Sequence, residues 1–88
     1  MKLYKYRNGK CNASGSEIKK LREASNLSQE QLAAKLQLNG LNISQKAISR
    51  IETGERIIPD YELLYFSKVF GVAINEILND TLIDHLDI

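Results

Sequence analysis

The chain has 88 residues, of which 43% are hydrophobic and 26% are charged, so its length and composition suit one small globular domain with a thin core. It contains no apolar run long enough to span a membrane, no signal peptide, and only one cysteine, Cys11, which cannot form an intramolecular disulfide. We therefore expect a cytoplasmic protein.

The net charge of +1 conceals an uneven distribution along the chain. Residues 1–58 contain 11 Lys or Arg and 5 Asp or Glu, a net +6, whereas residues 59–88 contain 1 Lys and 6 Asp or Glu, a net −5. Such a chain can present a positive face to nucleic acid, although the same asymmetry also arises by chance.

From residue 14 onward the apolar residues recur at helical spacing. The first expected helix opens with Ser14-Gly-Ser-Glu17, the spacing of a capping box in which Ser14 and Glu17 satisfy each other's free backbone amides. Asn26 is expected to close this helix. Its predicted core face consists of Ile18, Leu21 and Ala24.

A second capping box, Ser28-Gln-Glu-Gln31, opens the next expected helix. Ser44 is expected to cap a third helix, which Gly54 ends. The two buried stripes consist of Leu32, Ala33 and Leu36 in the second helix and Ala47, Ile48 and Ile51 in the third.

Asp60 directly follows the only proline, Pro59, and is predicted to cap a fourth helix that Gly71 ends. The inward face of this helix, at i, i+3, i+4 and i+7, consists of Leu63, Phe66, Ser67 and Phe70. A short fifth helix would hold Ile74, Ile77 and Leu78, with Ala73 as a poor cap.

These elements predict an all-α fold, a compact bundle of five short helices within a domain of residues 14–79. Residues 1–13 form a basic N-terminal arm that we expect to be mobile; the alternative is an arm that reaches into a DNA minor groove. Residues 80–88 form a C-terminal tail that extends the last helix or docks elsewhere. The apolar tail residues, which are candidates for a dimer surface or for the core, are Leu82, Ile83, Leu86 and Ile88.

Three segments resemble the lambda-repressor/Cro-like helix-turn-helix class, also called the xenobiotic-response-element family. They are "IKKLREASNLSQEQLAAKL", "ISQKAISRIETGER" and "DYELLYFSKVFGVAINEIL", in the family's order and over about two-thirds of the chain. The stretch "QLNGLNIS" departs from the family by lengthening the turn between the second and third helices by about four residues. A subset of phage-like regulators looks similar at this place.

The resemblance implies that residues 44–53 form the recognition helix, which lies in the major groove of DNA in this class. Arg and Lys suit guanine, and Gln suits adenine, in that groove. The outward residues that would contact bases are Gln45, Lys46, Ser49 and Arg50. The alternative is an ordinary solvated helix face.

The resemblance also places Gln29 against a backbone phosphate at the start of the second helix. Further candidates for phosphate contacts are Asn39, Asn42, Thr53 and Arg56, with Lys46 as another. Family members often pair residues at the places of Arg22 and Glu52 in a partly buried salt bridge, which would hold the recognition helix against the first helix. The alternative for Gln29 is a role only at the start of its own helix. The alternative for Arg22 and Glu52 is that they are separate surface charges.

The expected function is that of a sequence-specific transcriptional regulator of double-stranded DNA, a repressor that binds a pseudo-palindromic operator as a homodimer. The alternative is an antitoxin or another protein-interaction module, whose acidic C-terminal half binds a toxin or an anti-repressor. The sequence offers no nucleophile–base pair, no phosphate-binding glycine loop and no set of metal ligands, so we expect no enzyme, no metal and no cofactor.

Overall fold

The computed structural model describes residues 9–78, which contain five helices and no strand, in agreement with the expected all-α fold. The helices are α1 (Gly15–Ala24), α2 (Gln29–Leu38), α3 (Gln45–Thr53), α4 (Asp60–Phe70) and α5 (Ile74–Ile77). Every helix in this part of the chain is too short or too polar to cross a bilayer. Most of the expected N-terminal arm and the whole C-terminal tail lie outside the described residues.

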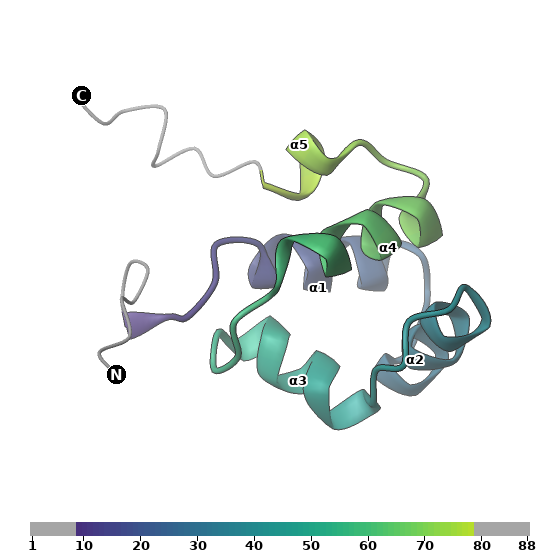
Figure 1. Ribbon diagram of the computed structural model, residues 1–88, viewed down its shortest axis with the longest axis horizontal. Helices are drawn as coiled ribbons and strands as arrows, with labels where there is room; N and C mark the ends of the chain where they lie inside the picture. The colour runs from purple at the N-terminus through teal and green to yellow at the C-terminus, as the bar shows by residue number, and fades with distance from the viewer. Residues whose placement is uncertain (1–8, 79–88) are drawn as a thin grey trace.

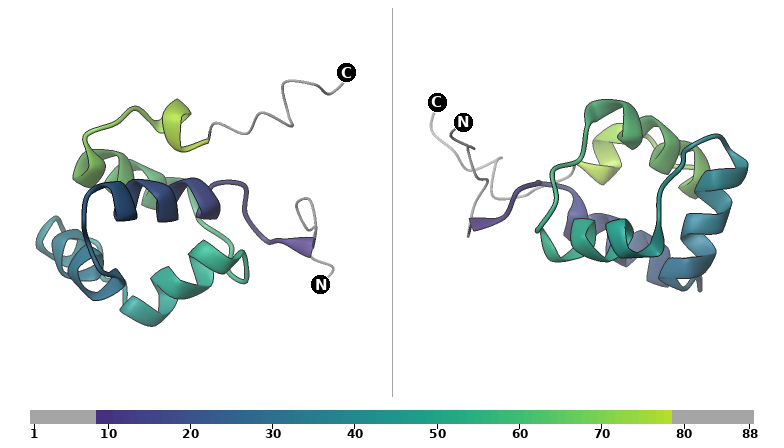
Figure 2. Two further views of the ribbon diagram at one scale, coloured as in Figure 1. Left: turned by 180° about the vertical axis from the view of Figure 1, so that it is seen from behind. Right: turned by 60° about the horizontal axis from the view of Figure 1, so that its bottom comes forward.

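The five helices surround one core, and α3 lies along an edge of the molecule. In Figure 1, α4 lies nearer the viewer than α1, and the reverse view in Figure 2 brings α1 to the front. Helix α3 runs along the lower edge, where it packs against α1 and α2, and α5 lies above α4. One long side of α3 therefore faces away from the rest of residues 9–78.

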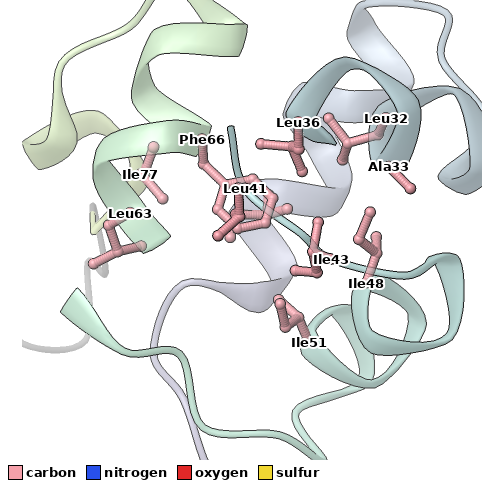
Figure 3. Close-up of a cluster of buried hydrophobic side chains, with 11 residues drawn as sticks. Leu32, Ala33, Leu36, Leu41, Ile43, Ile48, Ile51, Leu63, Phe66 and Ile77 are labelled. Carbon is pink, nitrogen blue, oxygen red and sulfur yellow. The ribbon is translucent and has the colours of Figure 1, made fainter. Parts of the chain in front are cut away.

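The core brings together apolar side chains from all five helices and from the long turn after α2 (Figure 3). Leu41 and Ile43 in this turn are buried. The side-chain amide of Gln37 also donates a 2.8 Å hydrogen bond to the carbonyl oxygen of Ile43. The insertion is thus held in one conformation by burial and by a hydrogen bond. The buried core residues are Ile18, Leu32, Ala33, Leu36, Leu41, Ile43, Ile48, Ile51, Leu63, Phe66 and Ile77.

The predicted starts of both motif helices and the predicted end of α3 are confirmed. Ser28 and Gln31 form the expected capping box, with hydrogen bonds of 3.0 and 2.8 Å. The Ser44 hydroxyl accepts a 3.1 Å hydrogen bond from the backbone amide of Ala47. Gly54 ends α3 in the left-handed region at φ 85°, where a side chain would be strained. These local signals fix the length and the starting point of α3.

The predicted capping box at Ser14 is wrong. The Ser14 side chain makes no capping hydrogen bond, and the side-chain oxygen of Asn12 accepts a 2.8 Å hydrogen bond from the amide of Gly15 instead. Ala24 is exposed and not in the core. It follows Ile18 by six residues, which places it about 120° around the helix from that buried side chain.

The predicted cap at Asp60 is also wrong by one residue. Pro59 occupies the N-cap position, and its carbonyl oxygen accepts a 3.0 Å hydrogen bond from the amide of Glu62. Asp60 is the first residue of α4, where its charge still favours the positive end of the helix dipole. The fixed backbone angle of proline thus sets this helix start without a side-chain cap.

Candidate DNA-binding surface

The outward side of α3 carries the four residues expected to contact bases. Gln45, Lys46 and Arg50 are exposed and Ser49 is half-buried, whereas Ile48 and Ile51 on the opposite side are completely buried. The helix therefore has a sharp division between a core side and a polar side. The polar side bears amide, ammonium, hydroxyl and guanidinium groups, which match the donors and acceptors of base edges.

A salt bridge fixes α3 to α1, as the resemblance implied. The Arg22 guanidinium binds both oxygens of the Glu52 carboxylate, with Nε at 2.7 Å from Oε2 and Nη2 at 3.0 Å from Oε1. Arg22 also donates to the carbonyl oxygen of Leu27 at 2.8 Å. The Glu52 hydrogen bond holds the pKa of Arg22 above its usual range. The side chains of Arg22 and Glu52 are only 12% and 2% exposed, so the pair is almost completely enclosed.

Two glutamines extend this pair to the outward side of α3. The side-chain amide of Gln29 donates a 3.0 Å hydrogen bond to Oε1 of Glu52. The side-chain amide of Gln45 donates in turn a 2.6 Å hydrogen bond to Oε1 of Gln29. A continuous chain of hydrogen bonds thus runs from Arg22 in α1 to Gln45, the first residue of α3. We call these four residues, Arg22, Glu52, Gln29 and Gln45, the polar chain.

The other residues expected to contact phosphate have different surroundings. Asn39 donates a 2.8 Å hydrogen bond to the carbonyl oxygen of Lys35 and so helps to end α2. Asn42 is exposed in the long turn. The Thr53 hydroxyl donates within the last turn of α3 and lies 2.9 Å from a carboxylate oxygen of Glu55. Thr53 thus bonds to the backbone of Ser49 and Arg50, whereas Gln29 bonds to the side chain of Gln45, another residue expected to contact a base.

Arg56 has a structural partner that the sequence reasoning missed. Its guanidinium binds both oxygens of the buried Glu62 carboxylate, at 2.7 and 3.0 Å. The Glu62 hydrogen bond raises the pKa of Arg56 above its usual range. This pair ties the loop after α3 to α4. In the sequence, Arg56 and Glu62 are separated by a short segment that contains Pro59, and this spacing predicts no specific pairing.

Asn12 makes a second connection that the sequence did not indicate. Its side-chain amide donates to the carbonyl oxygens of Ile51 at 3.0 Å and Arg56 at 2.8 Å. The amide of Cys11 donates a 2.7 Å hydrogen bond to the carbonyl oxygen of Gly54. The residues just before α1 therefore cap the end of α3 as well as the start of α1.

A shallow groove runs beside α3, between that helix and the loop that follows it. Lys46, Arg50 and Arg56 all line this groove, so three cationic side chains gather along one side of the outward face. Glu55 also lines the groove and Arg56 is paired with Glu62, so these two carboxylates offset part of the charge. Cations next to the residues expected to contact bases would suit the phosphate backbone on either side of a major groove.

Comparison with known families agrees with this arrangement. A family model described as helix-turn-helix matches residues 18–77, which are about two-thirds of the chain and include all of α2 and α3. No curated protein and no solved structure matches the chain. The matched residues contain the polar chain, the lengthened turn and the outward side of α3. The chain belongs to the helix-turn-helix family of the Cro/C1, lambda-repressor-like type, and its partner is DNA.

Proposed function

We propose that the protein is a sequence-specific transcriptional repressor that reads the major groove with the outward side of α3. The observation that carries the proposal is the polar chain. It links the side chain of Gln45, at the N-terminal end of the outward face, to the enclosed salt bridge between Arg22 and Glu52. A base-contacting residue fixed in this way loses less conformational entropy when it binds.

The hydrogen bonds of the polar chain leave the groups needed for an adenine contact. Gln45 uses one N–H of its side-chain amide for Gln29. Its second N–H and its carbonyl oxygen remain, and these two groups together match N7 and N6 of adenine. Arg50, one and a half turns further along α3, is exposed and suits O6 and N7 of guanine.

Gln29 supports the phosphate contact in the same arrangement. It accepts from Gln45 and donates one N–H to Glu52, so a second side-chain N–H remains for a phosphate oxygen. It is also the first residue of α2, where the free backbone amides of a helix start favour an anion. Lys46, Arg50 and the exposed part of Arg56 would add charge beside it, with Asn39, Asn42 and Thr53 as further contacts.

The regulatory outcome and the stoichiometry are part of the proposal. A domain in the major groove blocks RNA polymerase from a promoter that overlaps its site. Two copies on a pseudo-palindromic site, with half-sites one helical turn apart, would double the contacts without enlarging the domain.

Selection from random-sequence DNA tests the proposal. The wild type should enrich a two-fold symmetric motif, and a Gln45→Ala/Arg50→Ala variant should lose that motif while it keeps its circular dichroism and its melting temperature. Lys20→Ala, an exposed change on α1, is the control and should enrich the same motif as the wild type. Enrichment of the same motif by the double variant would contradict the assignment of α3. Transcription in vitro from a promoter that overlaps the motif should fall, and a rise would contradict the repressor role alone.

A further inference from the structure

One face of α4 exposes apolar side chains that the core does not use. Tyr61 and Leu64 are 55% and 58% exposed in the described structure, and they lie one turn apart on the same side of the helix. The opposite face of α4 carries the buried residues Leu63 and Phe66. Together a leucine and a tyrosine exposed on one helix face form a small apolar surface.

The charges on this face are arranged symmetrically about Leu64. Asp60 lies four residues before Leu64, and Lys68 lies four residues after it, and both are exposed. If two copies of α4 lie antiparallel with Leu64 against Leu64, Asp60 of each copy faces Lys68 of the other. A two-fold interface requires this self-complementarity, because the same surface of each copy meets the other. If Asp60 of one copy contacts Lys68 of the second, then Lys68 of the first copy contacts Asp60 of the second. We call the face defined by Asp60, Tyr61, Leu64 and Lys68 the α4 face.

We propose that the α4 face is the homodimer surface and that a second copy of this chain covers it, with the two α4 helices antiparallel about Leu64. The inference rests on the proposed function for its role, because it supplies the symmetric pairing that a pseudo-palindromic site requires. It differs from the C-terminal tail suggested by the sequence, which lies outside the described residues.

The interface is small, since it is formed by one face of an 11-residue helix. Interfaces of this size are weak in free solution. DNA that holds two copies side by side raises their effective concentration and makes the pairing stable. We therefore expect a mostly monomeric protein at low concentration and cooperative binding of two copies to a site with both halves.

Charge reversal tests the pairing. Asp60→Lys and Lys68→Asp each place like charges together at both ends of the interface. Each should weaken dimerisation, measured by sedimentation equilibrium, and should weaken cooperative binding to a full site. The double variant Asp60→Lys/Lys68→Asp restores opposite charges across the interface and should regain dimerisation. Lys20→Asp on α1 is the control for the charge change, and melting temperatures show whether each variant is folded.

Leu64→Glu tests the centre of the interface against Leu38→Glu, the same change at an exposed leucine of α2. Leu64→Glu should raise the dimer dissociation constant at least about tenfold and keep wild-type affinity for a single half-site, whereas Leu38→Glu should behave as the wild type. Equal loss in both variants, or none in Leu64→Glu, would overturn the inference. So would a wild type that binds a full site as two independent monomers, or nuclear magnetic resonance shifts showing that residues 79–88 of the same chain cover this face. A wild type that dimerises through α4 but binds no DNA would contradict only the proposed function.

Discussion

Gln45 of the recognition helix donates a 2.6 Å hydrogen bond to Gln29 of α2, and Gln29 donates a 3.0 Å hydrogen bond to the buried carboxylate of Glu52. The side chain that begins the outward face of α3 is therefore oriented by two other elements. Because Glu52 is itself bound by Arg22 of α1, a change far from the DNA surface can alter the position of Gln45.

Gln29→Ala should weaken binding to the preferred site and reduce the preference at the base pair that Gln45 contacts. The coupling between Gln29 and Gln45 in a double-mutant cycle with Gln45→Ala should be about 0.5–3 kcal/mol, because the two residues act as a unit. Fluorescence anisotropy with sites changed at single positions measures both effects. Additive losses from the two single variants would show that the hydrogen bond between the glutamines does not matter for binding.

Arg22→Met and Glu52→Leu should each lower the free energy of unfolding by about 2–4 kcal/mol, slightly below the figure for completely buried pairs. The Arg22 side chain is 12% exposed and that of Glu52 is 2% exposed, so either single change leaves an enclosed charge without its partner. The double variant Arg22→Met/Glu52→Leu should lose less unfolding free energy than the sum of the two single losses. Urea denaturation gives these values, and a loss below about 0.5 kcal/mol in both single variants would place the pair among ordinary surface salt bridges.

The stability that Arg22 contributes should persist into alkaline solution. Glu52 raises the pKa of Arg22 in the folded state, so the contribution is complete below the unfolded pKa of arginine and is lost only as the pH rises through the higher folded value. The difference in unfolding free energy between wild type and Arg22→Met should therefore stay constant from about pH 6 to about pH 10. A difference that disappears across this window would contradict a charged, enclosed Arg22.

Local signals in the sequence predicted the boundaries of the motif helices. Ser28, Gln31, Ser44 and Gly54 all act on backbone groups within a few residues of themselves, so their spacing is sufficient to predict what they do. The salt bridge between Arg22 and Glu52 came from the resemblance to a family, because no local pattern joins residues 30 positions apart.

Contacts between distant segments were not predictable in the same way. Asn12 caps α1 and also bonds to the end of α3, and nothing in residues 10–16 indicates the second role. Arg56 was expected on the surface, yet Glu62 binds it from a helix that begins after a proline turn. These interactions depend on how the helices pack, which single-sequence patterns do not contain.

Gly15→Ala should destabilise the fold although alanine usually favours a helix. A Cβ atom at Gly15 would lie 2.0 Å from the carbonyl oxygen of Ile51 and 2.8 Å from the side-chain oxygen of Asn12. Because the first contact is with backbone, α1 must move away from the end of α3, which costs about 1–3 kcal/mol. Thermal unfolding measures the loss. Ser16→Ala, an exposed change in the same turn, is the control and should leave the melting temperature nearly unchanged.

The most direct test of the central claim is fluorescence anisotropy of wild type and Arg50→Ala with a preferred site and with random-sequence DNA, across a series of salt concentrations. We expect the wild type to prefer its site, its affinity to fall steeply with salt, and Arg50→Ala to lose about 1–3 kcal/mol of discrimination. The residual binding of Arg50→Ala should have a salt slope smaller by about one if Arg50 also contacts a phosphate. Weak binding without preference that Arg50→Ala leaves unchanged would show that the outward side of α3 does not read DNA.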